Sequence, residues 1–499
     1  MKLRAFVLML VIVSGPLLVR AQENKQSFVE WLVEDNVLEH QLHPMHPMLV
    51  MEQSFPAKQV DSSIDVISYD VYADWYMALL TPRDMRPERK ATGRVKAVVK
   101  SRINDLKSVV FDGSSMAFDS VTSGGSRITF TKNAFSITMN LPKPLQRGQE
   151  VELTIYYANL RDRGAIFIWS KADANAVNVP YASGYTISEP EDARKWYPCN
   201  DQPDDKALFT SHMRVPKGFT FVSNGVQFES VADGDTAVIQ SRRLDVPMST
   251  YLFSMNASEY VEYPQTYTRS DNSTVPISSY QFGIDVDGAV LNAKNAYSNL
   301  PLMFAALEEK LGKYPFPTYG QVAVDPFQYG GMEHQSMTTV NRIWLNGNSE
   351  SGVAHELTHH WFGDKVTCGT WGDIWLNEGG ATWGEALYAE SRSGAGGYLA
   401  AMWSKRGDYM AKGLDEPPVY DIPLSNIFNQ PTTYAKASWV YHMMRTLVGD
   451  DLIFPALRGY LAKYAQSSAQ TFQLLDHLKS TILNLPVSWD VFFDQWLVK

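Results

Sequence analysis

The chain has 499 residues, which is too long for one ordinary hydrophobic core and long enough for about two or three domains. Apolar residues make up 45% of it and charged residues 20%, a balance that excludes an intrinsically disordered chain. The formal net charge of −10 argues against nucleic acid as the main partner.

The first residues have the form of a secretory signal peptide. Lys2 and Arg4 precede an apolar run over residues 5–19, and small residues at a cleavage position follow it. A membrane anchor is the alternative, but the run is short for a span and contains a Gly-Pro pair. We expect residues 1–21 to be removed and the chain to be exported, to the periplasm or outside the cell, without an integral membrane span.

Residues 22–60 include the proline-punctuated stretch "EHQLHPMHPMLV". Imidazole and thioether groups in such a stretch can bind copper. A segment of this composition is more often an extended lead-in, and this is the interpretation that we favour.

Short alternating segments fill residues 61–263. Examples are "VISYDVYADW", "RVKAVVKS" and "VELTIYYANL", and turn residues such as Asn224-Gly225 separate them. Period-two segments at this spacing predict an N-terminal, largely antiparallel β domain.

From about residue 264 the sequence becomes mixed and then mainly helical. The stretch "AVLNAKNAYSNLPLMFAALEEKLG" has helical spacing, and "QVAVDPF" is typical of a strand. Beyond residue 350 the expected helices cover 353–363, 378–393, 434–447, 451–465, 470–483 and 488–498. We therefore expect a second domain over residues 264–499 that ends mainly helical.

The run "AHELTHHWFGDKV", residues 354–366, is typical of a zinc site on a helix. His355 and His359 are four residues apart, so on a helix they lie on one face and can bind one ion. Glu356 points about 100° further round and would reach a water at the open position of the metal. Because this pattern also arises by chance, a catalytic site needs a third ligand.

Glu378, in "TWGDIWLNEGGATWGEAL", is the third ligand that the sequence offers. Eighteen residues separate it from His359, enough to end one helix, cross a loop and return antiparallel. Two imidazoles and a carboxylate are a known zinc set, whereas the structural alternative is an acid in a first helical turn. Glu385 lies two turns further along the same face, where it is either a hydrogen-bond partner of a ligand histidine or a surface carboxylate.

Four stretches, in this order, resemble the aminopeptidase N family of zinc aminopeptidases, which includes the leukotriene-epoxide hydrolase type. "SEPEDARKWYPCNDQPDDKALF" is similar to the family's run ending in Pro-Cys-x-Asp-x-Pro, and "YGGMEHQ" resembles its Gly-x-Met-Glu-Asn motif. The zinc motif follows, and "TYAKASWVYHMM" resembles the segment of the catalytic tyrosine. The likeness spans about residue 62 to the C-terminus. It implies a multi-domain chain, with an N-terminal antiparallel β domain followed by a thermolysin-like α+β, mainly helical catalytic domain.

The resemblance also implies a mechanism. His355, His359 and Glu378 would hold one zinc ion per chain, and Glu356 would act as general base toward the attacking water. Tyr434 would stabilise the developing oxyanion, whereas its structural alternative is a buried aromatic at the start of a helix.

The resemblance further implies where the substrate binds. Glu333 and Glu189 match the positions that bind the free α-ammonium of a peptide substrate in the family. Gly330 and Gly331 would let the chain approach the substrate backbone, and Met332 would shape the first side-chain pocket. Carboxylates at one end of the cleft favour peptides with a free N-terminus over mid-chain amides.

Two features depart from the family pattern. His334 stands where the family usually has asparagine, a change that concerns the first subsite and leaves the metal ligands intact. "DVFFDQWLVK" resembles the end of the family's catalytic domain, so the usual C-terminal domains are expected to be absent, either in a minimal form or because the sequence is a fragment.

The function that we expect from the sequence is an exported zinc aminopeptidase. Two alternatives belong to other classes. Epoxide hydrolysis on the same zinc is the first, although the helical domain that would recognise a lipid carboxylate is expected to be absent. A catalytically silent binding scaffold is the second, and the presence of every residue of the proposed apparatus opposes it.

Overall fold

The computed structural model describes residues 63–81, 91–159, 164–168, 182–282, 292–412, 416–483 and 485–499, which all belong to one compact unit, Phe55–Lys499. The signal peptide expected over residues 1–21 and the lead-in expected over residues 22–60 lie outside the described residues. Within the described ranges, no helix has both the length and the hydropathy that a membrane span requires.

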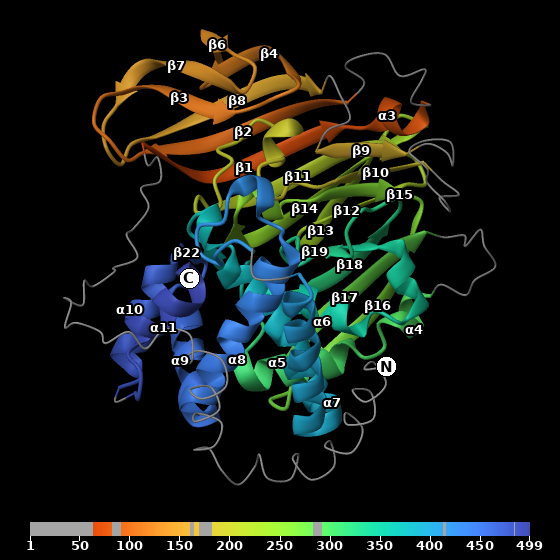
Figure 1. Ribbon diagram of the computed structural model, residues 1–499. Helices are drawn as coiled ribbons and strands as arrows, with labels where there is room; N and C mark the ends of the chain where they lie inside the picture. Colours follow the sequence, from red (N-terminus) through yellow and green to blue (C-terminus); the bar gives the residue numbers. More distant parts are fainter. Residues whose placement is uncertain are drawn as a thin grey trace, which may run out of the picture. The chain divides into compact units, whose positions relative to one another are not determined.

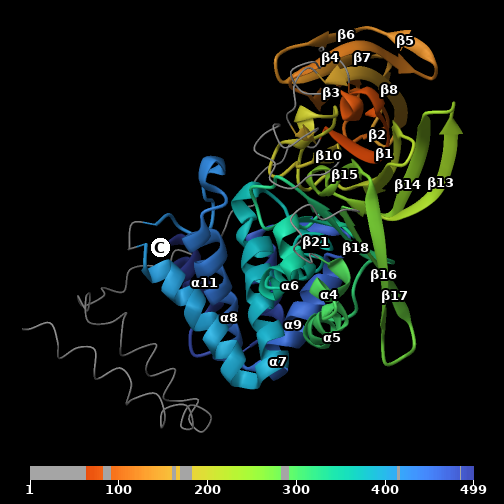
Figure 2. The same cartoon turned by 90° about the vertical axis from the view of Figure 1, so that its right-hand side faces the viewer.

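An eight-stranded sheet forms the centre of the N-terminal part, in the strand order β13-β14-β11-β1-β2-β8-β4-β5 (Figures 1 and 2). Its strands are β1 (Ile64–Asp74), β2 (Thr92–Ser101), β4 (Met116–Ser123), β5 (Ser126–Ile128), β8 (Glu150–Asn159), β11 (Ala207–Pro216), β13 (Val226–Asp233) and β14 (Ala237–Met248). Buried and more exposed residues alternate along β2, which is the period-two pattern that the sequence predicted. All pairs are antiparallel except β1 with β11, and the long connection between these two strands makes their parallel pairing possible.

Two smaller sheets complete the N-terminal part. The three-stranded sheet contains β3 (Leu106–Asp112), β7 (Ser136–Leu145) and β6 (Phe130–Lys132), and the four-stranded sheet contains β12 (Thr220–Ser223), β15 (Met255–Ser258), β10 (Ser183–Thr186) and β9 (Ala165–Ile168). Short helical turns accompany them: α3 (Tyr76–Leu80), η2 (Ala193–Lys195) and η3 (Thr250–Leu252). The apolar side chains of these elements form a common core, which supports the loop after β10 where Glu189 lies.

A five-stranded sheet opens the second part, in the order β16-β17-β18-β20-β19. Its strands are β16 (Tyr260–Thr268), β17 (Thr274–Phe282), β18 (Tyr319–Val324), β20 (Thr338–Asn341) and β19 (Gly331–Met332). β18 is buried along its whole length between two parallel neighbours, as expected of a central strand. Among the strands that the structure describes, β19 is an edge strand that pairs with β20 alone, over two residues.

Helices form most of the remaining chain. They are α4 (Ala293–Ala296), α5 (Leu300–Leu311), η4 (Arg342–Asn346), α6 (Glu350–His359), η5 (Trp371–Asp373), α7 (Trp375–Met410), η6 (Leu424–Asn426), the π-helix η7 (Gln430–Lys436), α8 (Ala437–Val448), α9 (Asp450–Lys463), α10 (Thr471–Thr481), α11 (Trp489–Phe493) and the π-helix η8 (Asp494–Val498), with a small sheet of β21 (Val366–Cys368) and β22 (Ser467–Ala469). Their apolar faces share a second core. The predicted fold class, a β-rich part followed by a mixed, mainly helical part, is confirmed (Figure 1).

Helix α7 is longer than the helix expected over residues 378–393. Its backbone leaves the helical conformation at Ser393 and at Gly394, which has a φ of 63°, and then continues to Met410. Three glycines between residues 394 and 397 weaken the helical signal, so the sequence did not predict this second half. The missed half carries Lys405, which lines the cleft described below.

A buried lysine of the N-terminal part holds the loop that follows α6. Lys206 Nζ donates to the carbonyl oxygen of Asp364 at 2.5 Å and lies 3.4 Å from that of Lys365. Burial lowers the pKa of Lys206 to about 7, although the nearby Asp364 carboxylate opposes this shift. A side chain of the β part therefore fixes the end of the helix that carries the histidine motif.

Asn224 makes a second link between the two parts, and all of its amide contacts are buried. Its Nδ2 donates to the carbonyl oxygens of Leu252 and Gln335, at 2.9 and 2.7 Å. Its Oδ1 accepts from the backbone N–H of Ser254 at 2.9 Å. Gln335 follows β19 closely, so this amide ties the β part to the strand at the edge of the cleft.

We predict that Asn224→Ala lowers the free energy of unfolding by about 2–4 kcal/mol, because three buried backbone groups lose their partner. Urea unfolding followed by circular dichroism measures this. The matched control is Asn140→Ala, whose amide donates to Thr129 Oγ1 at an exposed position and should change the value by less than about 0.5 kcal/mol. Equal effects of the two substitutions would contradict the prediction.

Candidate metal centre and substrate cleft

Helix α6 presents one face to the core and the other to a cleft. Val353 and Leu357, four residues apart, are fully buried among apolar side chains. His355, Glu356 and His359 line the cleft instead. The apolar face thus fixes the rotation of the helix, and this rotation directs the histidine motif into the cleft.

Helix α7 packs beside α6 and brings Glu378 to the two histidines. Glu378 Oε2 lies 3.3 Å from Nε2 of His355 and 3.3 Å from Nε2 of His359. The two Nε2 atoms are 3.0 Å apart, and all three potential ligand atoms lie within 4.8 Å of one another. The side chains of His355, His359 and Glu378 thus converge on one point, as the sequence predicted.

The other nitrogens of the two imidazoles are held by fixed partners. His355 Nδ1 lies 3.1 Å from Glu385 Oε1, and His359 Nδ1 lies 3.1 Å from the carbonyl oxygen of Phe362. Each contact suits an N–H on Nδ1, which leaves the Nε2 lone pair directed at the shared point.

Glu385 is itself held in place. Its Oε2 accepts hydrogen bonds from Lys405 Nζ at 2.9 Å and Ser351 Oγ at 2.5 Å. Burial raises the pKa of Glu385, but His355 and Lys405 outweigh it and lower the pKa to about 2. Glu385 is therefore an ionised, buried partner of His355, and a surface carboxylate is excluded.

The donor set fits a zinc ion. Glu378 Oε2 is buried and, among the described residues, has no hydrogen-bond partner, so two imidazoles and an uncompensated carboxylate oxygen meet at one point. Burial raises the pKa of Glu378, but His359 and His355 outweigh it and lower the pKa to about 2. Two imidazole nitrogens and one carboxylate oxygen are a ligand set that zinc prefers in catalytic sites.

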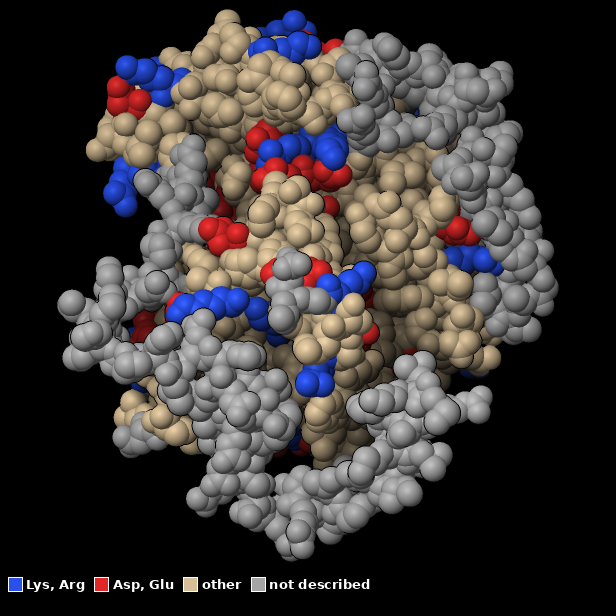
Figure 3. All heavy atoms as spheres, in the orientation of Figure 1, with Lys and Arg blue, Asp and Glu red and all other residues tan. Residues whose placement is uncertain are grey.

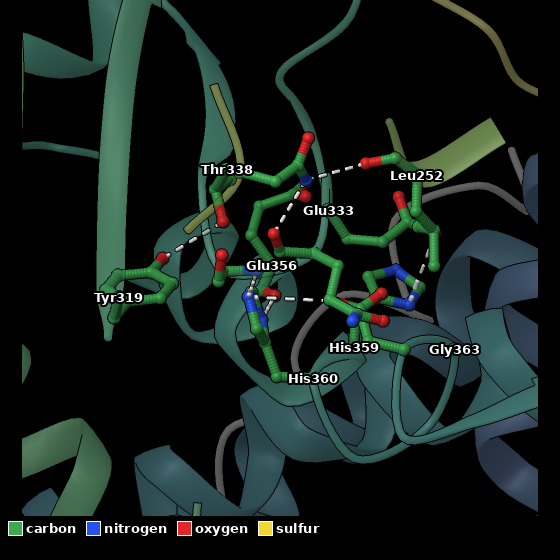
Figure 4. A network of polar contacts seen from close by, with 12 residues as sticks. Leu252, Tyr319, Glu333, Thr338, Glu356, His359, His360 and Gly363 are labelled. Carbon is green, nitrogen blue, oxygen red and sulfur yellow. Dashed lines mark hydrogen bonds and ion pairs between the residues drawn. The ribbon is translucent and has the colours of Figure 1, made fainter. Parts of the chain in front are cut away.

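Glu356 and Glu333 line the same cleft as this group, and Figure 4 shows both acids near His359. Burial raises the pKa of Glu356 to about 8, with an opposing effect from the two histidines. Glu333 Oε1 is 3.9 Å from His359 Nδ1, and burial raises the pKa of Glu333 as well. The ring of His360, the residue after α6, packs against Tyr319. Its Nε2 accepts a hydrogen bond from the backbone N–H of Ser336, so His360 takes no part in the ligand group.

Glu189, from the loop after β10, lines the same cleft as Glu333. Burial raises the pKa of Glu189, and the charge of Glu333 raises it further. Oε1 of Glu189 and Oε1 of Glu333 are both buried without a hydrogen-bond partner among the residues that the structure describes. Two such carboxylates on one wall make a site that favours a cation with several N–H donors.

Tyr434 lines the cleft from the π-helix η7, a distortion that is frequent at functional sites. Its ring stacks on that of His355, with centroids 6.0 Å apart and an interplanar angle of 25°. Burial raises the pKa of the Tyr434 phenol and the Glu378 carboxylate raises it further, so the phenol keeps its proton.

The cleft has a volume of about 710 Å³ and is bounded on one side by β19. Gly330, Gly331 and Met332 line it, as expected. His334 does not: its ring is buried, its Nδ1 lies 2.9 Å from Thr339 Oγ1, and burial lowers its pKa to about 3. His334, which departs from the family pattern, is therefore an uncharged, buried side chain that contacts Thr339 of β20.

Sequence reasoning missed several cleft residues, among them Lys405 and Trp344. Lys405 lies in the glycine-interrupted half of α7, where no helix was expected. Trp344 lies in η4, eleven residues before His355, and a single tryptophan carries no spacing signal of its own. Only the fold brings these side chains to the site.

Two family descriptions match this chain in sequence. The Peptidase M1 N-terminal domain matches residues 67–252, and the Peptidase family M1 domain matches residues 296–496. The chain belongs to peptidase family M1. This is the family of aminopeptidase N, so the resemblance expected from the sequence motifs is confirmed. Zinc is the metal that this family implies for the His355, His359 and Glu378 group.

Relatives in this family include aminopeptidase N of Bos taurus, which is 26% identical over 414 residues, 73% of this chain and 40% of that protein. Aminopeptidase N of Haemonchus contortus is 24% identical over 478 residues, 87% of this chain and 48% of that protein. The chain thus spans less than half the length of these curated relatives.

Solved structures show the same fold. The M1 zinc metallopeptidase from Deinococcus radiodurans matches with a TM-score of 0.73 and 23% identity, over 88% of this chain and 94% of that one. A mutant of that metallopeptidase bound to a Tyr-Ser-Ala substrate matches with a TM-score of 0.72 and 23% identity, over 88% of this chain and 95% of that one.

We predict that Glu385→Gln weakens zinc binding by about 10- to 100-fold, because the His355 imidazole loses its anionic partner and the Lys405 ammonium loses its own. Competition with a zinc chelator of known affinity measures this. Glu309→Gln, at a carboxylate that is 72% exposed on α5, is the control and should leave the affinity unchanged. A zinc affinity of Glu385→Gln within about twofold of the wild type would contradict the prediction.

Proposed function

We propose that this protein is a zinc-dependent aminopeptidase that hydrolyses the first peptide bond of peptides with a free N-terminus. The observation that supports it most strongly is the content of one cleft: a metal-binding group stands beside two buried carboxylates that lack partners among the described residues. Membership of peptidase family M1 supports the same class of reaction.

His355, His359 and Glu378 would hold one zinc ion per chain. When bound, zinc acts as a Lewis acid that acidifies water and polarises the scissile carbonyl. Glu356 is the general base: its carboxylate accepts a proton from the attacking water and then delivers it to the departing amine. The burial that raises the pKa of Glu356 makes its carboxylate a stronger proton acceptor than an exposed glutamate.

Tyr434 donates its phenolic hydrogen to the carbonyl oxygen as that oxygen gains negative charge. The protonated state of the phenol and its place in the cleft beside His355 support this role. Since the charge appears only in the transition state, this hydrogen bond accelerates the reaction without tightening substrate binding.

Glu189 and Glu333 bind the α-ammonium of the substrate. A buried carboxylate pair gains an ion pair with the ammonium, whereas a mid-chain amide would leave both charges uncompensated. β19 offers its unpaired edge to the peptide backbone, with Gly330, Gly331 and Met332 along the wall. The activity is therefore that of an exopeptidase. The form of residues 1–21 supports a place of action in the periplasm or outside the cell.

The first test of this proposal compares free-amine and N-acetylated substrates. We expect residues 22–499 to release the chromophore from aminoacyl chromogenic amides, to lose this activity with a zinc chelator, and to cleave the N-acetylated counterparts at least about 100-fold more slowly, since buried acids would lose their cation. Equal cleavage of blocked substrates would indicate an endopeptidase. A zinc-bound protein without any cleavage would indicate a binding scaffold.

Two substitutions test the chemical roles. We expect Glu356→Gln to retain zinc and to lose nearly all turnover, and Tyr434→Phe to lower kcat by about 10²–10³-fold with little change in KM. Metal content, kcat and KM are measured for each variant. Tyr156→Phe, at an exposed tyrosine of β8, is the control for removal of a phenol. Wild-type turnover in Glu356→Gln would remove the general-base assignment.

A further inference from the structure

Trp344 lies in the cleft wall at a place that neither the metal group nor the carboxylate pair explains. It belongs to η4, and its half-buried indole packs against the core of the second part. Asn341, the residue before η4, ties this helix to the segment that leads into β19. Its N–H donates to the carbonyl oxygen of Gly330 at 2.8 Å, and its Nδ2 donates to the carbonyl oxygens of Phe327 and Tyr329. The position of Trp344 is therefore tied to the start of β19.

Two glycines make room for the indole. A Cβ on Gly330 would lie 2.5 Å from Trp344 Cζ2, and a Cβ on Gly352 would lie 2.6 Å from Trp344 Cη2. Gly330 precedes β19 and Gly352 lies on α6, so the ring is wedged between the backbone beside the edge strand and the backbone of the helix with the histidine motif. A side chain at either position would displace the ring.

Contacts along the strand give the cleft a direction. Gly330 contacts the ring of Trp344. The next residue, Gly331, packs on Glu356, since a Cβ there would lie 2.3 Å from Glu356 Cδ. Glu333 then stands 3.9 Å from His359. On α6 the same order recurs, because Gly352 and Glu356 are four residues apart and share one helix face. Trp344 and Glu333 thus mark opposite ends of the strand, with Glu356 between them.

This direction, which rests on the proposed function, places the parts of a peptide. The ammonium is at Glu333 and the attacked carbonyl is beside Glu356, so the residues after the scissile bond extend toward Gly330 and Trp344. Trp344 lines the cleft on that side, and the exposed part of its indole would stabilise a large apolar side chain, an aromatic one most of all.

We infer that Trp344 is a specificity-determining residue that forms the leaving-group side of the cleft and favours peptides with an aromatic residue in the second position. The ring touches the second residue of the substrate and takes no part in proton transfer. Its removal therefore changes the choice among peptides more than the rate on small ones.

The test uses tripeptides X-Phe-Ala and X-Ala-Ala, where X is the residue whose chromogenic amide is cleaved fastest. We expect the wild type to prefer X-Phe-Ala by about tenfold in kcat/KM. Trp344→Ala should lower kcat/KM about tenfold on X-Phe-Ala and less than about twofold on X-Ala-Ala, and Trp344→Phe should keep most of the preference. Ile343→Ala, at the exposed neighbour in η4, is the matched control and should keep the whole preference.

Binding without turnover gives an independent readout. In the Glu356→Gln background, calorimetry should show the Kd for X-Phe-Ala rising about tenfold on Trp344→Ala, with zinc content unchanged. The inference is overturned if the wild type does not distinguish the two peptides, or if Trp344→Ala weakens both equally. Absence of cleavage of any free-amine substrate by the wild type would instead refute the proposed function, on which this inference depends.

Discussion

A group of carboxyl groups buried in one cleft is the constraint on which the site depends. Glu189, Glu333, Glu356 and Glu378 all line one wall region, and each has a buried oxygen without a hydrogen-bond partner among the described residues. Keeping carboxylates out of water costs free energy unless positive charge approaches them. The cleft therefore favours two cations, one between the imidazoles and one at the Glu189 and Glu333 end.

The two hydrophobic cores of the protein hold in place the elements that carry these carboxylates. One core fixes α6 and α7, and hence the relative positions of the histidines and Glu378. The other supports the loop of Glu189. Lys206 and Asn224 then join the two parts through hydrogen bonds, so that acids from distant stretches of sequence line one cleft.

Local sequence signals were sufficient for the metal group and for most elements. His355 and His359 follow from helical spacing, and Glu378 follows from the distance that an antiparallel return requires. Alternation predicted the strands of the β part, but it could not predict that β1 and β11 run parallel, because pairing across so many residues depends on the whole sheet. Glu189 has no local signal of a site and was found only through the resemblance to a family. Lys405 was missed because glycines hide the second half of α7, and the burial of His334 could not be read from its place in a motif.

The two-residue length of β19 has a consequence for the kind of molecule that can enter. Such a short edge provides few main-chain hydrogen bonds, so pairing with internal residues of a polypeptide contributes little binding free energy. Under the proposed function, recognition would then depend on the N-terminus. A compact protein, whose terminus is packed, would first have to release several residues as a free tail. Under the proposed function, a folded protein with a packed terminus would be a poor substrate until that terminus unfolds.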